Sequence, residues 1–328
     1  MSEFIGTKLT MNLGERSYDI IVKSGSLENL YQFARLDRRV AVVTDSGVPA
    51  QYAQRVADQC KDARIITVPQ GEASKSFKIL ESVLRQMLDF GMGRGDLVVA
   101  VGGGVVGDLA GFAASIYMRG IDFINCPTTT LSMIDSSIGG KTAVDLGDTK
   151  NIVGAFWQPK LVIVDPDTLS TLPRRHYING LAEAVKASLL ADPELFAIFE
   201  KGDIDVQIGE IICRSLRFKK GIVEQDETEQ GMRKALNFGH TIGHGIEAVK
   251  GIKGRRTVGL FHGECVALGM LPMIESKALQ KRVRAVYRRL GLPVRTTYNK
   301  EKVLAEMLHD KKAQGGQITV IKVPGLGC

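Results

Sequence analysis

Apolar residues in the first half of the chain form short continuous runs, and amphipathic stretches separate these runs. Residues 39–45 (RVAVVTD) form such a run, and helical periodicity follows at 49–59. Runs of Val, Ile and Ala that alternate with helices are typical of a parallel sheet covered on both faces. Further strands are predicted at 64–68, 96–101, 123–126 and 161–165, and a helix at about 74–90. The alternation at 18–22 predicts short antiparallel strands near the start of the chain.

Beyond about residue 169 the pattern becomes that of amphipathic helices. Helical periodicity is present at 175–191, 206–224, 233–249, 259–279 and 301–310, and one late strand is predicted at 317–322. We therefore predict two domains, an α/β domain at 1–170 with a parallel sheet and a mainly α-helical domain at 171–328.

Composition and charge limit the classes of function. The formal net charge of +7 is spread along the chain, and aromatic residues make up only 6% of it. A nucleic-acid surface needs clustered cations with stacking side chains, so no nucleic-acid partner is expected, and a small anionic substrate accounts for the basic excess as well. The apolar run at 97–118 contains Asp108 and several glycines, so it is not a membrane span. Scattered cysteines and the absence of a signal-peptide pattern fit a cytoplasmic location.

A glycine-rich turn at 102–108 (GGGVVGD) links a predicted strand to a predicted helix and has the form GxGxxG. Such a turn lets the backbone approach a pyrophosphate, whose charge meets the helix N-terminus. In an ordinary Rossmann unit, however, the turn follows the first strand, whereas here about 100 residues precede it. Nucleotide binding and a merely tight strand–helix turn both stay open. Asp45, which ends an earlier strand, suits either a ribose contact or a helix N-cap.

The segment 128–151 is too rich in small residues for a plain surface loop, and it carries Asp135, Lys141, Lys150 and Asn151. The sequence GGKT at 139–142 imitates the end of a phosphate-binding P-loop, but Asp135 occupies a position that requires glycine. A nucleoside triphosphatase is therefore excluded, and a functional role for these polar residues is favoured.

Three of the five histidines lie close together in the sequence. His240 and His244 are spaced i and i+4 in a segment with helical periodicity, so both imidazoles should share one helix face. His262 precedes another apolar run. Satisfied core histidines are the plain interpretation, but the third histidine and the nearby Asn237 favour a metal or acid–base site.

Glu183 and Lys186 lie three residues apart in an otherwise apolar helical segment. A surface ion pair is the usual role of this spacing. The apolar surroundings also make Glu183 a candidate carboxylate ligand for a metal, with a nearby ammonium.

Six segments, in order along almost the whole chain, resemble the 3-dehydroquinate synthase family. They are GGGVVGDLAGFAASIYMRG at 102–120, PTTTLSMIDSSIGGKT at 127–142, KNIVGAFWQP at 150–159, GLAEAVK at 180–186, NFGHTIGH at 237–244 and HGE at 262–264. The resemblance implies a Rossmann-like parallel-sheet domain that binds NAD, followed by a mainly helical domain that binds Zn²⁺ or Co²⁺. It also implies a homodimer.

The resemblance further implies a reaction of the shikimate pathway, which leads to aromatic amino acids. The substrate would be a phosphorylated sugar acid, 3-deoxy-D-arabino-heptulosonate 7-phosphate, and the products 3-dehydroquinate and phosphate. In this family NAD oxidises a substrate hydroxyl transiently, phosphate is eliminated, the hydride is returned, and the ring recloses in an aldol step. The metal stabilises the oxygen of that hydroxyl as it loses its proton.

The resemblance also assigns roles to individual residues. The metal ligands would be Glu183, His240 and His262, a set that leaves positions open for substrate oxygens. Lys186 and Asp135 would lie near the reacting hydroxyl, and Lys219 and Arg233 would bind the substrate carboxylate. The substrate phosphate would be bound by Lys141, Asn151, Asn237, His244 and either Lys311 or Lys312. Arg119 would be lent to the site of the partner subunit. The residues expected at NAD are Asp45, Glu72, Lys75, Gly104, Val105, Val106, Gly107, Asp108, Thr128, Thr129, Lys141, Lys150, Thr168 and Thr171.

On this assignment one helix presents Asn237, His240 and His244 as a single polar stripe that serves both the metal and the leaving phosphate. The nearest alternative is another sugar phosphate cyclase, of the 2-deoxy-scyllo-inosose or valiolone type, whose substrate lacks the carboxylate. Arg233 beside Lys219 favours dehydroquinate synthase, because a guanidinium fork suits a planar carboxylate. A metal-dependent alcohol or glycerol dehydrogenase, which would release NADH stoichiometrically, and a non-catalytic NAD-binding protein are further alternatives.

Overall fold

The computed structural model describes residues 6–147, 149–249, 252, 259–312 and 318–327, with residues 309–312 described by their backbone alone. The chain divides into two compact units, Met1–Pro173 and Arg174–Cys328. This division lies close to the boundary predicted near residue 170. No helix in the described part of the chain is long and apolar enough to cross a membrane.

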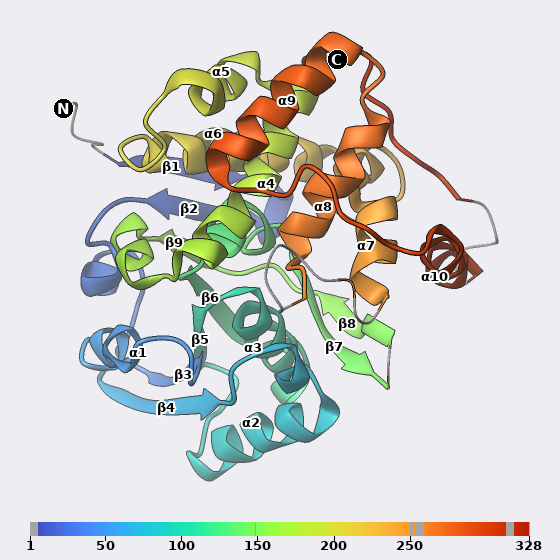
Figure 1. Ribbon diagram of the computed structural model, residues 1–328. Helices are drawn as coiled ribbons and strands as arrows, with labels where there is room; N and C mark the ends of the chain where they lie inside the picture. The colour runs from blue at the N-terminus through green and yellow to red at the C-terminus, as the bar shows by residue number, and fades with distance from the viewer. Residues whose placement is uncertain (1–5, 148, 250–251, 253–258, 313–317, 328) are drawn as a thin grey trace. The chain divides into compact units, whose positions relative to one another are not determined.

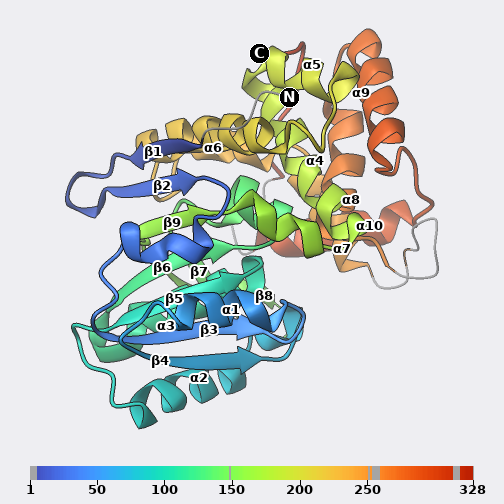
Figure 2. The same ribbon diagram turned by 90° about the vertical axis from the view of Figure 1, so that its left-hand side faces the viewer.

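The first unit is built on a seven-stranded sheet with the strand order β1-β2-β9-β6-β5-β3-β4 (Figures 1 and 2). β1 and β2 pair antiparallel, and the other neighbouring strands of this sheet pair parallel. The strands are β1 (Thr7–Met11), β2 (Tyr18–Val22), β3 (Arg39–Asp45), β4 (Asp62–Val68), β5 (Leu97–Gly102), β6 (Asp122–Pro127) and β9 (Leu161–Val164). The predicted parallel sheet and the predicted early antiparallel strands are both confirmed.

Helices cover both faces of this sheet, because neighbouring residues of a strand point to opposite faces and both sets are apolar here. Helix α1 (Ala50–Ala57) and the 3₁₀ helix η2 (Leu27–Gln32) pack on the face that carries Val42 and Val99. Helices α2 (Phe77–Asp89) and α3 (Gly104–Ile116) pack on the face that carries Val43 and Val98.

The carboxyl ends of the parallel strands gather several predicted site residues at one edge of the sheet. Asp45 is the last residue of β3, and β5 ends at Gly102, where the glycine-rich turn begins. Thr128 directly follows β6, and Asp165 directly follows β9. In open α/β sheets this edge is the usual place for a ligand.

A β-hairpin that the sequence pattern did not predict lies within the segment 128–151 and extends beyond it. Its strands are β7 (Lys141–Leu146) and β8 (Thr149–Phe156), which pair antiparallel. The hairpin packs closely on α3, since a Cβ atom added to Gly111 would lie only 2.5 Å from Thr142 Cγ2. Small residues in α3 therefore fix the position of the strands that carry Lys141, Lys150 and Asn151.

The second unit is mainly α-helical, as predicted. Its helices are α4 (Arg174–Ala191), α5 (Pro193–Lys201), α6 (Ile208–Gln225), α7 (His240–Ala248), α8 (His262–Met270), α9 (Lys277–Leu290) and α10 (Lys300–Lys312), with 3₁₀ helices η7 (Met232–Asn237) and η8 (Leu271–Met273). α7 packs against α8 and α10, and α4 packs against α8 (Figure 1). Helices α5 and α9 were not predicted.

Three predictions in this unit are wrong in detail. The single helix predicted at 233–249 is broken, because Gly239 adopts a left-handed conformation (φ +80°) and α7 begins only at His240. The helix predicted at 259–279 ends at Met270, since Pro272 cannot supply the N–H that a continuing helix needs. In place of a strand at 317–322, the described residues 318–322 form no ladder, and the nearest pairing is an isolated bridge between Ile274 and Val323.

Candidate functional site

Helix α4 buries a carboxylate and an ammonium side by side. Residues 179–189 of this helix are all buried, as expected for a helix with apolar or small residues on every side. Glu183 and Lys186 are spaced i and i+3, and Lys186 Nζ forms an ion pair with Glu183 Oε2. Lys186 Nζ also donates a hydrogen bond to the carbonyl oxygen of Leu236 at 2.9 Å. The pair is therefore buried and is not the surface ion pair of the plain interpretation.

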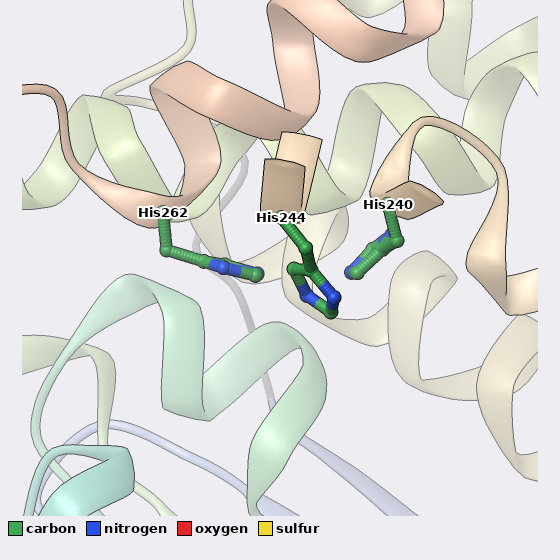
Figure 3. A group of neighbouring side chains, drawn as sticks. All are labelled: His240, His244 and His262. Carbon is green, nitrogen blue, oxygen red and sulfur yellow. The ribbon is translucent and has the colours of Figure 1, made fainter. Parts of the chain in front are cut away.

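The imidazoles of α7 and α8 face the same carboxylate. His240 Nε2 lies 3.5 Å from Glu183 Oε1, and His262 Nε2 lies 3.8 Å from the same oxygen. The ligand atoms of His240, His244 and His262 all lie within 4.8 Å of one another, and Figure 3 shows the three rings converging. Helical spacing thus brings His240 and His244 to one face, as predicted.

The environment keeps His240 able to donate a lone pair. Its Nδ1 atom lies 3.2 Å from the carbonyl oxygen of Phe238, which favours a proton on Nδ1 and a lone pair on Nε2. Burial, and then the charges of Lys186, His262 and His244, lower the pKa of His240 well below its usual range. A neutral imidazole is the form that binds a metal.

His262 has a different partner. Its Nδ1 atom lies 2.9 Å from Glu247 Oε2, a residue of α7. Burial opposes the charged form of His262, but the hydrogen bond to Glu247 and the charges of Glu183 and Glu247 outweigh burial and raise the pKa of His262. Each of the two imidazoles that face Glu183 therefore has its Nδ1 atom engaged and its Nε2 atom turned towards the carboxylate.

Glycines set the distance between the two histidine-bearing helices. A Cβ atom added to Gly269 would lie 2.1 Å from the carbonyl oxygen of Gly239, and one added to Gly243 would lie 3.1 Å from Val266 Cα. Any larger residue at these positions would push α7 and α8 apart. The left-handed Gly239 also allows the chain to turn directly into α7.

The start of α8 is held by a polar clamp. Glu264 accepts a hydrogen bond from the backbone N–H of Phe261 at 2.8 Å, and Arg175 binds both Glu264 oxygens at 2.9 and 2.7 Å. The Arg175 guanidinium also lies 3.9 Å from the centre of the Phe261 ring. These contacts fix the turn that presents His262, the residue that follows Phe261.

The donor set of this cluster suits a divalent metal. Neither oxygen of the buried Glu183 carboxylate accepts a hydrogen bond from the described residues, apart from the ion-pair contact with Lys186. A buried carboxylate normally has such donors, so Glu183 is suited to a further cation. Carboxylate oxygen and imidazole nitrogen are the ligands that Zn²⁺ and similar ions prefer.

Three residues predicted at the cofactor or substrate meet in the first unit. Lys75 Nζ forms an ion pair with Asp108 Oδ2 at 2.7 Å and donates a hydrogen bond to Asn151 Oδ1. Asp145 connects both ends of this contact, because its N–H donates to the Lys75 carbonyl oxygen and its Oδ1 accepts from the Asn151 N–H. Glu72 Oε1 lies 4.0 Å from Lys75 Nζ. The structure thus brings together residues far apart in the sequence.

The glycine-rich turn has the predicted strand–turn–helix form. α3 begins at Gly104 without a side-chain cap, so its first N–H groups receive no capping side chain. Thr129 and Ser136 approach this turn closely, since Cβ atoms added to Gly103 and Gly104 would lie 3.0 Å from Thr129 Cγ2 and Ser136 Oγ. The buried Ser136 hydroxyl has no hydrogen-bond partner among the described residues.

Asp45 is not the N-cap of the following helix, which is Pro49. Its Oδ1 accepts hydrogen bonds from the N–H groups of Gly47 at 2.7 Å and Val48 at 3.2 Å, so it closes the turn after β3. The helix-cap alternative is therefore wrong in detail, although the side chain does bind backbone N–H groups.

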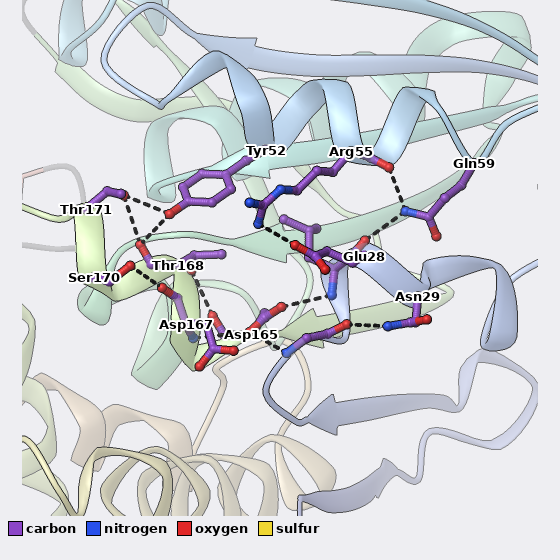
Figure 4. A network of polar contacts seen from close by, with 12 residues as sticks. Glu28, Asn29, Tyr52, Arg55, Gln59, Asp165, Asp167, Thr168, Ser170 and Thr171 are labelled. Atoms are coloured by element: carbon purple, nitrogen blue, oxygen red, sulfur yellow. Dashed lines mark hydrogen bonds and ion pairs between the residues drawn. The ribbon is translucent and has the colours of Figure 1, made fainter.

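Thr168 and Thr171 belong to a polar network at the edge of the same unit (Figure 4). The Tyr52 hydroxyl lies 2.9 Å from Thr171 Oγ1 and donates to the Thr168 carbonyl oxygen at 3.3 Å. The Thr168 hydroxyl donates to the Asp165 carbonyl oxygen, and the Asp165 carboxylate accepts from the N–H groups of Gly25 and Leu27. Burial raises the pKa of Asp165, although these N–H groups oppose the shift.

The loop before α7 positions the predicted carboxylate-binding arginine. Arg233 is only 2% exposed and donates a hydrogen bond to the Glu227 carbonyl oxygen. Asp226 accepts hydrogen bonds from three backbone N–H groups of this loop, and those from Arg233, Gln230 and Gly231 lower its pKa. Lys219, on α6, is also buried.

Other predicted residues lie in varied surroundings. Asn237 ends η7 and donates to Glu229 Oε1 at 3.3 Å, so it is not one turn before His240 on the same helix. Asp135 lies in a short π-helical turn, Ser132–Ser136, and Lys141 and Lys150 are exposed on the hairpin. Arg119 is exposed in a left-handed bend (φ +69°). The side chains of Lys311 and Lys312 lie outside the described residues.

Sequence reasoning missed several side chains that organise the site. Glu247 lies at i+7 from His240, and this spacing could have identified it as part of the same helix face. Asp226 precedes a run of polar residues and Gly231, which is a turn signal. No local pattern joins Arg175 to Glu264, because the two are distant in the sequence.

Comparison with known proteins identifies the family. The family profile described as 3-dehydroquinate synthase N-terminal matches residues 65–179, and that described as 3-dehydroquinate synthase C-terminal matches residues 180–313. The 3-dehydroquinate synthase of Streptococcus mutans serotype c is 41% identical over 341 residues, which cover 98% of this chain and 95% of that protein. The chain belongs to the 3-dehydroquinate synthase family. It is an enzyme of the shikimate pathway, a phosphate-eliminating lyase.

Solved structures of related cyclases share the fold. A 2-deoxy-scyllo-inosose synthase complexed with carbaglucose-6-phosphate, NAD⁺ and Co²⁺ has a TM-score of 0.87 at 24% identity, with 98% of this chain and 93% of that chain covered. The 2-epi-5-epi-valiolone synthase ValA from Streptomyces hygroscopicus subsp. jinggangensis 5008, with NAD⁺ and Zn²⁺ bound, has a TM-score of 0.84 at 28% identity, with 96% and 92% covered. These cyclases are less similar in sequence than the dehydroquinate synthase from Streptococcus, which agrees with the preference stated above.

Proposed function

We propose that the protein converts 3-deoxy-D-arabino-heptulosonate 7-phosphate to 3-dehydroquinate and phosphate with catalytic NAD and one divalent metal ion. The observation that carries this proposal is the Glu183 carboxylate. It is buried, it faces the Nε2 atoms of His240 and His262, and apart from the ion-pair contact with Lys186 neither of its oxygens accepts a hydrogen bond from the described residues. A metal ion would complete this arrangement.

The metal would be Zn²⁺ or Co²⁺, held by Glu183, His240 and His262. When bound, it would act as a Lewis acid on a substrate oxygen. His244 lies in the same group of imidazoles, and we assign it to the substrate phosphate beside the metal. Lys186 would neutralise the second Glu183 oxygen and lie near the reacting hydroxyl together with Asp135.

The NAD site would lie at the carboxyl edge of the sheet in the first unit. The uncapped N-terminus of α3 and the glycines before it fit a pyrophosphate, because no capping side chain accepts a hydrogen bond from the first N–H groups of the helix. When bound, NAD would accept a hydride and return it within one turnover. The turn residues and their neighbours would hold it, and the full set is Asp45, Glu72, Lys75, Gly104, Val105, Val106, Gly107, Asp108, Thr128, Thr129, Lys141, Lys150, Thr168 and Thr171.

The charged ends of the substrate would be bound by cationic side chains. Arg233 and Lys219 are both buried, and a guanidinium together with an ammonium suits a carboxylate. The phosphate would be bound by Lys141, Asn151, Asn237, His244 and one of Lys311 and Lys312. This carboxylate pair is what favours dehydroquinate synthesis over the reactions of the related cyclases.

A homodimer is part of the proposal. Arg119 is exposed, and the next residue, Gly120, lies close to the Trp157 ring, which would be 2.5 Å from a Cβ atom added to Gly120. An exposed arginine fits a residue lent to a partner subunit's site. Analytical ultracentrifugation should give twice the chain mass, and a monomer that is fully active would overturn this part.

The decisive experiment is a phosphate-release assay with the heptulosonate phosphate, a trace of NAD and added Co²⁺ or Zn²⁺. We expect phosphate in large molar excess over NAD, with no accumulation of NADH. The proposal fails if no phosphate appears, or if NADH accumulates in proportion to the substrate consumed, as in a dehydrogenase.

Replacing Arg233 by lysine tests the carboxylate site. The R233K variant keeps the charge but loses the two-pronged geometry, so KM should rise roughly 10-fold or more while kcat changes less. The matched control is R282K, because Arg282 makes a similar two-pronged contact with Glu200 on the surface. In steady-state kinetics R233K should have a clearly higher KM than R282K, and equal KM values for the two variants would contradict the assignment.

A further inference from the structure

Helix α7 presents three functional side chains on one face. His240, His244 and Glu247 are spaced i, i+4 and i+7, so they lie along one side of the helix. Glu247 reaches across to α8, where its Oε2 lies 2.9 Å from His262 Nδ1. One helix therefore supplies two imidazoles and also a contact to the imidazole of the neighbouring helix.

We propose that Glu247 is a positioning residue that fixes the ring orientation and tautomer of His262. A carboxylate that accepts a hydrogen bond from Nδ1–H leaves the lone pair on Nε2. The Nε2 atom is the one that faces Glu183, at 3.8 Å from Oε1. This inference rests on the proposed role of His262 as a metal ligand and extends it to a residue with no assigned role.

The two metal-binding imidazoles are oriented by different means. The Nδ1 atom of His240 lies against the backbone carbonyl oxygen of Phe238, which a substitution cannot remove. The Nδ1 atom of His262 lies against a side chain, and both members of this contact are partly exposed, His262 by 30% and Glu247 by 23%. His262 is therefore the ligand whose orientation depends on a single replaceable side chain.

Partial exposure makes the role of Glu247 testable. A ring that is not enclosed on all sides can rotate or exchange its proton between nitrogens once its partner is removed. Replacement of Glu247 should then lower the fraction of molecules in which His262 offers Nε2 to the metal. Residues that orient metal ligands typically contribute about 10- to 100-fold to metal affinity.

The experiment measures Co²⁺ affinity of the metal-free full-length protein by visible absorption in competition with a chelator. We expect E247A to bind Co²⁺ about 10- to 100-fold more weakly than the unaltered protein. E247Q should recover most of the affinity because its amide oxygen can accept the same hydrogen bond. E247D should lose affinity as E247A does, because its carboxylate is one carbon too short to reach the ring.

The control variant is E224A. Glu224 pairs with Lys220 at 2.8 Å, and its side chain is 21% exposed, close to the 23% of Glu247. Its Co²⁺ affinity should equal that of the unaltered protein. Nitrogen-15 NMR of the metal-free protein gives a second reading, in which His262 should carry its proton on Nδ1 in the unaltered protein and E247Q and lose this preference in E247D.

The outcomes separate this inference from the proposed function. If the unaltered protein does not bind Co²⁺, the proposed metal site fails and the role of Glu247 fails with it. If the unaltered protein binds Co²⁺, and E247A and E247D both bind it as tightly as the unaltered protein does, the metal site stands and only the role of Glu247 is overturned. If E247A does not fold, the same test is made by comparing E247D with E247Q. Equal Co²⁺ affinities and the same preference for a proton on His262 Nδ1 in these two variants would overturn the role of Glu247.

Discussion

Two buried lysines, one in each unit, form ion pairs with carboxylates in very different surroundings. Lys75 and Lys186 are each only 3% exposed. Lys75 pairs with Asp108, whose side chain is 22% exposed, and also binds the Asn151 amide oxygen. Lys186 pairs with Glu183, whose side chain is 1% exposed and whose other oxygen faces two imidazoles.

The two carboxylates differ in how much solvent stabilises their negative charge. Asp108 keeps contact with solvent, so one ammonium is enough to stabilise it. Glu183 has lost its solvent and gains one ammonium, while its neighbouring imidazoles are the kind that bind metals in neutral form. Burial of a lysine beside an acid therefore does not by itself indicate a metal site. A buried carboxylate whose partner among the described residues is one ammonium, and which faces imidazoles, does.

The largest effect should come from replacing each carboxylate by its amide. On the proposed ligand set, E183Q removes the one anionic ligand of the metal, so phosphate release should fall by on the order of 10²- to 10³-fold. D108N should leave Co²⁺ affinity unchanged, because Asp108 belongs to the other unit's ion pair. Co²⁺ titration followed by absorption checks both variants. Equal losses of Co²⁺ binding would break the distinction between the two clusters.

Replacing each lysine by methionine should have the next largest effect. K186M leaves Glu183 buried without its ammonium and should cost about 3 kcal/mol of stability in the metal-free protein, part of which added Co²⁺ should restore. K75M should cost less, since Asp108 is partly solvated, and Co²⁺ should not restore it. Differential scanning calorimetry with and without Co²⁺ measures both. A loss in K75M that Co²⁺ reverses would contradict this comparison.

The smallest effect should come from Asn151, which binds Lys75 and has a left-handed backbone (φ +55°). N151A loses the hydrogen bond and strains the backbone, and should lower the stability of the first unit by about 1–2 kcal/mol. N151G loses the same hydrogen bond without the strain, so it should be the milder change by about 1 kcal/mol. Thermal unfolding of the two variants separates the contributions, and a more stable N151A would show that the bend is not strained.

Much of the first unit could be predicted from the sequence because strand composition and glycine position are local signals. The run at 39–45 became β3 with the same bounds, and the turn at 102–108 links β5 to α3 as expected. The hairpin of β7 and β8 was missed because small and polar residues there hide the alternation of a strand. The contact between Lys75 and Asn151 could not be predicted, since 76 positions separate them and only the hairpin brings them together.

In the second unit the residues were easier to predict than their arrangement. The helical segments around Glu183 and the histidines were expected, yet the break at Gly239 depends on a backbone angle that composition does not specify. The break removes Asn237 from the helix face of His240 and His244. Glu247 takes its place on that face, at the other end of the same helix.

The close contact of α7 and α8 has a consequence for the size of the ion. Gly269 and Gly243 leave no room between the helix backbones, so the separation of His240 and His262 is set by main chain against main chain. Because the helices cannot move closer together around a smaller cation, the fixed separation of the two ring nitrogens should favour cations of one ionic radius. Zn²⁺ and Co²⁺, which are nearly equal in radius, should therefore replace one another readily at the proposed site, while the larger Ca²⁺ would have to be accommodated by movement of the side chains alone.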